Sequence, residues 1–187
     1  HSDLSIATPE GHFVRQRHAL DSGWTFRRGR ARRAWLDGAG EGVPVSLPHC
    51  WNAIEEFQPG RDYYRGAAGY RTAFDLPAHA SGGNWRLRSH GFYGTGALRI
   101  NGHAAGAFSG DYLGWDLDVT PWLRPGTNLL ACTLTNDCAR HVLPGNREPD
   151  FLLYGGLAGR VWLEHLPVTH WREERFTIAC RGPEDGS

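Results

Sequence analysis

Apolar and polar residues alternate along much of this 187-residue chain, with the period of two that a half-buried β-strand requires. The clearest example is the segment 70–76, in which Tyr, Thr, Phe and Leu alternate with Arg, Ala and Asp. Similar alternation, or a short apolar run between turn residues, predicts further strands at 24–26, 43–47, 85–89, 97–100, 103–108, 115–119, 128–135, 161–166 and 176–180. Nine or ten short strands without a convincing amphipathic helix predict an all-β fold, either a sandwich or a barrel.

Turn residues separate these segments. Asn101-Gly102 stands between two of them, and Asn-Gly is the strongest two-residue hairpin signal because both central residues of a type I′ turn need positive φ. The segment 27–42 is charged and rich in glycine, and 50–61 mixes aromatic with polar residues, so both are predicted to be loops. One short helical turn is predicted at 120–123.

The composition supports this architecture. The chain holds 25 Gly and 11 Pro, which suit tight turns, together with 8 Trp, 6 Tyr and 8 Phe, which suit a core of short strands. The length fits one domain, or one domain with a fragment of another. We expect residues 1–20 to be an N-terminal extension, 21–166 to form the domain, and 167–187 to begin a following domain or a linker.

The charge pattern excludes several partners. The 20 basic residues are all Arg and are matched by 20 acidic residues, so the net charge is zero and no basic face is declared. Nucleic acid and an anionic membrane surface are therefore not predicted as partners. No apolar run reaches membrane-spanning length. No signal peptide is visible at the N-terminus, and the compartment stays open, with a periplasmic or secreted location slightly favoured.

The spacing of the four cysteines indicates neither a disulfide framework nor a metal site. They stand at 50, 132, 138 and 180 without a C-x-x-C pair, and Cys132 is in phase with Leu130 and Leu134, as a small core residue would be. The 10 histidines show no tetrahedral spacing. No cofactor is predicted. A structural calcium ion stays open, because backbone carbonyls supply many of its ligands and leave no motif.

The stretch 146–161 carries the most distinctive chemistry. Asp150 is followed by Phe151 and Tyr154, and then by Gly155-Gly156, which permit a tight bend. A carboxylate accepts hydrogen bonds from sugar hydroxyls, and aromatic rings offer apolar faces to a pyranose. Taken alone, the stretch is more typical of a tight turn with a buried tyrosine.

Aromatic residues outside the alternating core positions recur near planar polar groups, which is the combination that polyol recognition requires. The aromatic set is Tyr63, Tyr64, Tyr93, Tyr112, Phe151 and Tyr154. The polar set is Asp62, Arg65, Asp111, Asn136, Arg147 and Asp150. Sugar binding is therefore a candidate function, weighed against purely structural roles for each ring.

Catalysis by this chain has weaker support. A glycosidase needs two carboxylates roughly 5–10 Å apart. Adjacent acidic pairs on a strand face opposite ways, and Asp116 and Asp118 share what we expect to be a solvent face. A distant pair such as Asp62 with Asp150 stays open. No G-x-S-x-G elbow is present, so a serine hydrolase is not predicted.

Six segments in order resemble the N-terminal jelly-roll (sugar-binding) domain of glycoside hydrolase family 2, which includes β-galactosidases, β-glucuronidases and β-mannosidases. The sequence L-D-S-G-W-T-F is similar to the family's L-x-x-G-W-x-F, and P-D-F-L-L-Y-G-G-L is similar to its D-F-x-x-Y-G-G-I. The matching segments are 20–26, 45–52, 63–74, 98–103, 115–131 and 149–157. The resemblance implies an antiparallel β-sandwich of jelly-roll, galactose-binding-like type.

The resemblance also implies a role within a larger enzyme. The family's two catalytic glutamates lie on a later (β/α)8 barrel, so no catalytic residue is carried over, and the chain alone is expected to be inactive. Asp150 matches an aspartate that the jelly roll lends to the sugar pocket, and Asn136 lies near it by analogy. With Tyr64 and Tyr154 from the aromatic set, these are the four candidate substrate-binding residues. The family's G-G-I-Y-R-D-V is altered here to G-G-L-A-G-R-V.

The sequence therefore favours a non-catalytic sugar-binding domain of a retaining, β-galactosidase-like β-glycosidase. Its expected partners are a carbohydrate substrate, the catalytic barrel and an immunoglobulin-like domain of the parent chain. Two alternatives stay open: a free-standing carbohydrate-binding module, and a structural or interaction domain without a sugar site.

Overall fold

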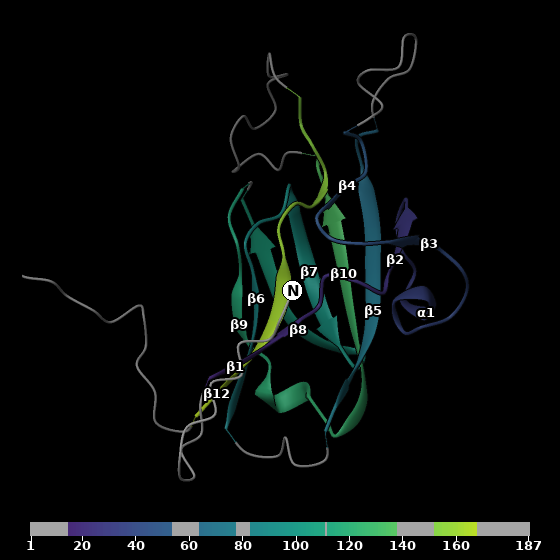
Figure 1. Cartoon of the computed structure of the whole chain (residues 1–187). Coiled ribbons are helices and arrows are strands. Elements are labelled where there is room, and N and C mark those ends of the chain that lie inside the picture. The colour runs from purple at the N-terminus through teal and green to yellow at the C-terminus, as the bar shows by residue number, and fades with distance from the viewer. Residues whose placement is uncertain (1–14, 54–63, 78–82, 111, 138–151, 168–187) are drawn as a thin grey trace, which may run out of the picture.

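The computed structural model describes residues 15–53, 64–77, 83–110, 112–137 and 152–167. These residues form two antiparallel sheets packed face to face, so the predicted all-β sandwich of jelly-roll type is confirmed (Figure 1). Within them, no helix is long and apolar enough to span a membrane.

The larger sheet has six strands and the smaller has four, with two further short strands at one end. In spatial order the larger sheet comprises β3 (Val43–Val45), β2 (Trp24–Arg28), β5 (Ala67–Leu76), β10 (Gly126–Thr135), β7 (Thr95–Ile100) and β8 (His103–Ser109). The smaller sheet comprises β1 (Gln16–Ala19), β12 (Val161–Leu166), β6 (Asn84–Ser89) and β9 (Asp116–Asp118). The short strands β4 (His49–Cys50) and β11 (Gly156–Leu157) pair with each other.

The core lies between the two sheets and follows the alternation in the sequence. On β10, Leu130, Cys132 and Leu134 are buried, and they meet Val161 and Leu163 from β12 in one apolar cluster. Each fully buried aliphatic side chain contributes about 1.5–3 kcal/mol relative to its exposed state. The prediction that Cys132 is a core residue is confirmed.

The Asn-Gly hairpin between β7 and β8 is also confirmed. Asn101 has φ 50° and Gly102 has φ 81°, as a type I′ turn requires. The Asn101 amide does more than turn the chain, because it donates to Asn128 Oδ1 at 2.8 Å and accepts from Leu129 N at 2.9 Å. The fully buried Asn128 donates in turn to the carbonyl of Arg124 and stands near the start of β10, at the end of the sandwich opposite Thr135 on that strand.

Two expectations about the first fifty residues are wrong. Residues 16–19, assigned to an extension, form the edge strand β1, which pairs with β12. The predicted loop 27–42 contains the short helix α1 (Arg33–Leu36). Trp35 of α1 packs on the outer face of the larger sheet, where Arg71 lies over its ring at 4.5 Å and donates to its carbonyl at 2.6 Å. Tertiary packing therefore stabilises a helix too short to form alone.

A ladder of charges crosses the outer face of the smaller sheet. Arg17, Glu164, Arg88 and Asp116 stand on the four neighbouring strands and alternate in sign. The Glu164 carboxylate is fully buried and lies 2.8 Å from Arg17 Nε and 3.1 Å from Arg88 Nε. Asp116 is exposed and lies 3.0 Å from Arg88 Nη2. The prediction that Asp116 and Asp118 share a solvent face is confirmed, although the Asp116 carboxylate is paired with arginine.

Candidate functional site

Loops from both sheets meet at the end of the sandwich that carries β4 and β11, which we call the loop end (Figure 1). Its described segments are 49–52, 64–66, 90–94, 112–114, 136–137 and 152–160. Three of the four candidate residues, Tyr64, Asn136 and Tyr154, lie here. Asp150, the fourth, lies outside the described residues, as do Asp62 and Phe151.

Two buried asparagines hold the loop end together. Asn52 is 2% exposed and Asn136 is 3% exposed. Their Nδ2 atoms both donate to the carbonyl of Leu153, at 3.0 Å from Asn52 and 2.8 Å from Asn136. Both also donate to the carbonyl of Tyr64, at 3.2 Å and 3.3 Å. The loop around Tyr64 and the loop around Leu153 are therefore clamped to each other.

The amide oxygens complete this clamp. Asn52 Oδ1 accepts from Gly155 N at 3.0 Å, and Asn136 Oδ1 accepts from Gly66 N at 2.8 Å. Both ends of the Asn136 amide thus bond to backbone inside the protein. Its observed role is to position the loops, and direct contact with substrate stays a prediction without support in these bonds. Asn52 was missed by sequence reasoning, since its partners lie far along the chain.

Gly155 and Gly156 are required by close packing. A Cβ on Gly155 would lie 2.0 Å from Trp51 Cζ2, and one on Gly156 would lie 2.1 Å from the His49 carbonyl oxygen. Gly156 also has φ 143°, which favours glycine. The double glycine of the sequence motif therefore lets β11 pass directly over β4 and the Trp51 ring.

Tyr64 is half-buried and faces its neighbours in the protein. Its hydroxyl donates to the Ala67 carbonyl at 2.7 Å. Arg28 lies over the ring at 4.7 Å, and the Trp51 ring meets it edge-on at 6.4 Å. These contacts give Tyr64 a structural role in the observed arrangement, and a contact with substrate stays a prediction.

Three of the predicted loop aromatics form a row across the loop end. Tyr154 and Tyr93 have ring centroids 5.8 Å apart, and Tyr93 and Tyr112 have centroids 5.0 Å apart in an edge-to-face arrangement. The row runs from half-buried Tyr154 to Tyr112, which is 60% exposed. We call these three residues the tyrosine row. The sequence marked each ring as a loop aromatic but not that they meet.

Where the loop end adjoins the core, His49 and Tyr70 form a polar contact. His49 Nδ1 lies 2.8 Å from the Tyr70 hydroxyl. Burial lowers the pKa of His49, because the charged imidazolium loses its hydration. Burial also raises the pKa of Tyr70 well above its usual value. Both groups are therefore neutral near pH 7, and the pair contributes a hydrogen bond without a charge.

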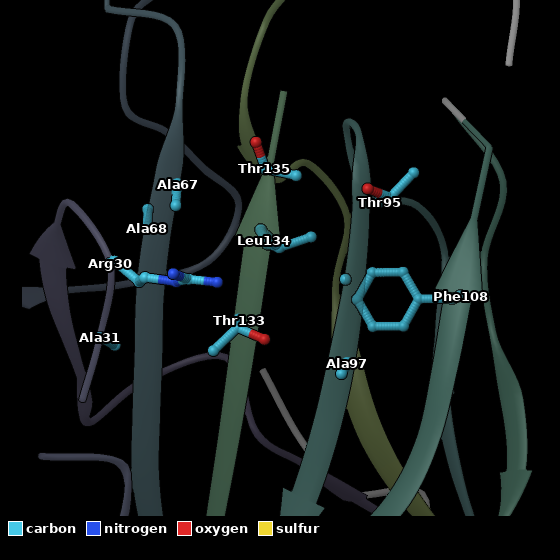
Figure 2. A pocket seen from close by; sticks show the side chains of 11 residues that line it. Arg30, Ala31, Ala67, Ala68, Thr95, Ala97, Phe108, Thr133, Leu134 and Thr135 are labelled. Carbon is cyan, nitrogen blue, oxygen red and sulfur yellow. The ribbon is translucent and has the colours of Figure 1, made fainter. Parts of the chain in front are cut away.

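A shallow groove of about 370 Å³ lies on the outer face of the larger sheet (Figure 2). Small side chains on β5, β10 and β7 form its floor, including Ala67, Thr133 and Ala97, and Arg30 extends over β5 toward β10. It gathers none of the four candidate residues. Among the described residues, no group of three or more His, Cys, Asp or Glu could hold a metal ion.

Together, the fold and the loop end define the chain as a domain of the galactose-binding-like jelly-roll type, with aromatic loops at one end of the sandwich. No family model matches the chain. It is 28% identical over 164 residues to a β-glucuronidase of Bacteroides fragilis and 26% identical over 136 residues to a β-galactosidase of Thermoanaerobacter pseudethanolicus. These alignments cover 84% and 72% of the chain but only 21% and 18% of the two relatives.

Solved structures agree. Bacteroides uniformis β-glucuronidase 2, covalently bound to cyclophellitol-6-carboxylate aziridine, superposes with a TM-score of 0.73 at 29% identity. The match covers 82% of this chain and 18% of that protein. The resemblance to glycoside hydrolase family 2 is thereby confirmed, and the chain corresponds to a domain-sized part of such proteins.

Proposed function

We propose that this chain is a non-catalytic domain of a retaining β-glycosidase and that its loop end contributes to the substrate pocket. The catalytic barrel of the parent protein and an immunoglobulin-like domain are its partners in this proposal. The substrate is a β-galactoside or a related β-glycoside, in agreement with the names of the relatives. Asp150 accepts hydrogen bonds from substrate hydroxyls and takes no part in bond cleavage.

One observation carries this proposal: the double asparagine clamp. The chain uses two buried side chains on one carbonyl to fix the Leu153 loop, which directly follows the segment bearing Asp150. A loop that only connects strands needs no such bracing, whereas a binding loop must hold its groups in place before the ligand arrives. The Tyr64 loop is fixed by the same two amides.

The test is Asp150→Ala in the natural polypeptide that carries this chain together with its catalytic domain. Hydrogen bonds to a charged group are each worth about 1.5–3 kcal/mol, so kcat/KM on aryl β-glycosides should fall about 10- to 100-fold. Asp75→Ala is the matched control, because that carboxylate is exposed at the opposite end of β5 and bonds only to Thr127 among the described contacts. Near-wild-type kinetics of Asp150→Ala on several aryl glycosides would refute the role.

The free-standing binding module makes a different prediction. It requires the isolated 187-residue chain to bind a sugar as tightly as the natural polypeptide does, so that no other domain adds to the affinity. An exposed apolar patch with no sugar binding at all would instead support the structural or interaction domain.

A further inference from the structure

The tyrosine row stands on a rigid base of three crossing loops. Tyr93 N donates to Gly156 O at 2.9 Å, and Tyr112 N donates to Phe92 O at 2.9 Å. Phe92 itself is 1% exposed and packs edge-on against Phe108 at 4.2 Å. Phe92 therefore anchors this loop in the core, while its neighbour Tyr93 takes part in the tyrosine row. These bonds fix the backbone of the loops that carry Tyr93 and Tyr112.

The outer end of the row is unusual in its backbone. Tyr112 has φ 68°, in the left-handed region that a residue with a Cβ seldom occupies. Glycine adopts this conformation without strain, and many loop positions in this chain carry glycine with positive φ. A large, 60%-exposed ring at such a position gains little from burial. Residues with strained backbone conformations concentrate at binding sites, which favours a functional role for the Tyr112 ring.

The next residue along the chain is exposed as well. Leu113 is 63% exposed, and Tyr112 and Leu113 are two of the three most exposed large hydrophobic residues in the described part of the chain. The third, Val43, lies on the edge strand β3. Tyr112 and its chain neighbour Leu113 thus leave two large apolar side chains exposed at the outer end of the tyrosine row.

We propose that Tyr112, Leu113 and Tyr93 bind the second sugar ring of a β-linked oligosaccharide, on the leaving-group side of the scissile bond. Their side chains are uncharged, which suits a neutral pyranose. The ring face of Tyr112 receives the C–H face of the sugar, and the tyrosine hydroxyls bond to its hydroxyls. The row leads inward to Tyr154 and the clamped Leu153 loop, so the first ring is directed toward the pocket. This inference rests on the proposed function, because it assigns one part of the same ligand.

Binding is measured on the 187-residue chain by NMR titration with lactose and cellobiose, with methyl β-galactoside as the single-ring comparison. We expect millimolar binding of the disaccharides, with the amide signals of Tyr93, Tyr112 and Leu113 shifting most. The single-ring sugar should leave these signals almost unchanged. Tyr112→Ala should weaken disaccharide binding about fivefold to tenfold, and Tyr112→Phe should retain most of it.

Tyr112→Gly separates a binding role from a structural one. Glycine relieves the backbone strain at φ 68°, so the melting temperature should stay the same or rise while disaccharide binding is lost. Val43→Ala, which removes an equally exposed side chain far from the row, should change neither quantity. A lower melting temperature for Tyr112→Gly together with unchanged disaccharide binding would show that the ring is structural and would overturn the inference.

Two further outcomes decide the matter. If neither disaccharide shifts the Tyr93, Tyr112 and Leu113 signals, the tyrosine row is not a sugar site. If the disaccharides bind but the affinity falls in Asp150→Ala and not in Tyr112→Ala, the proposed function stands and the present inference fails.

Discussion

The double asparagine clamp predicts an effect on stability that only a combination of two substitutions can reveal. Asn52→Ala removes one of the two donors to Leu153 O, and the donor from Asn136 remains. Its main loss is therefore the acceptor for Gly155 N. By the same reasoning, Asn136→Ala leaves Leu153 O bonded to Asn52 and deprives Gly66 N of its side-chain acceptor.

The magnitudes follow from these bonds. Leaving one buried backbone N–H without its partner costs about 1–3 kcal/mol, so each single variant should lose roughly that amount of unfolding free energy. The double variant takes both side-chain donors from Leu153 O as well, and Leu153 is 4% exposed. We therefore expect the double loss to exceed the sum of the single losses by about 1 kcal/mol or more.

The assay is a double-mutant cycle from urea unfolding of the 187-residue chain, with equal m-values as the check on two-state behaviour. Asn128→Ala provides the control, because Asn128 is also fully buried but stands at the opposite end of the sandwich. Its combination with Asn52→Ala should be additive. Additivity of Asn52→Ala with Asn136→Ala to within about 0.5 kcal/mol would refute the shared-carbonyl reasoning.

Three further predictions concern the same region and the core. Gly155→Ala should destabilise the chain by about 1–3 kcal/mol in thermal or urea unfolding, because its Cβ would lie 2.0 Å from Trp51 Cζ2; an unchanged midpoint would contradict the packing. Burial lowers the pKa of His49, so as the pH falls the unfolded chain takes up the imidazole proton before the folded chain does. The free energy of unfolding should therefore decrease as the pH falls below about 6.5. His49→Gln should flatten this slope relative to wild type, and an identical slope would rule out the assignment. Burial also raises the pKa of the Cys132 thiol, so mass mapping should find Cys132 unalkylated in the native chain and alkylated in denaturant; native labelling would show that the core opens there.

The parts of the fold that the sequence predicted are those with a local signal. Period-two alternation marks a strand because successive side chains face opposite sides, and Asn101-Gly102 specifies a hairpin by its own φ angles. β1 has no such pattern, since its four residues are exposed at an edge and it exists through pairing with β12. α1 likewise depends on the contact between Trp35 and Arg71, which no local window contains.

The candidate site divides in the same way. Loop aromatics could be recognised from the sequence, because they stand outside the alternating positions. Their meeting could not, since Tyr93, Tyr112 and Tyr154 come from three separate loops. Asn136 was selected as a polar loop residue and by analogy with the family, and only the three-dimensional contacts show that its amide is directed at backbone. Asn52 reaches a carbonyl 101 residues away, so nothing near it in the chain marks its role.

The strand order of the smaller sheet constrains the order of folding. β12 lies between β1 and β6, although it is the last strand of the described chain. Until residues 161–166 arrive, β1 has no neighbour and the basic side chains on β1 and β6 lack the Glu164 carboxylate. Non-local pairing of this kind slows folding, because the entropy of closing a long loop is lost before the contacts that compensate for it can form. During synthesis, the larger sheet can therefore assemble first, while the part of the core that Val161 and Leu163 fill stays incomplete until β12 pairs.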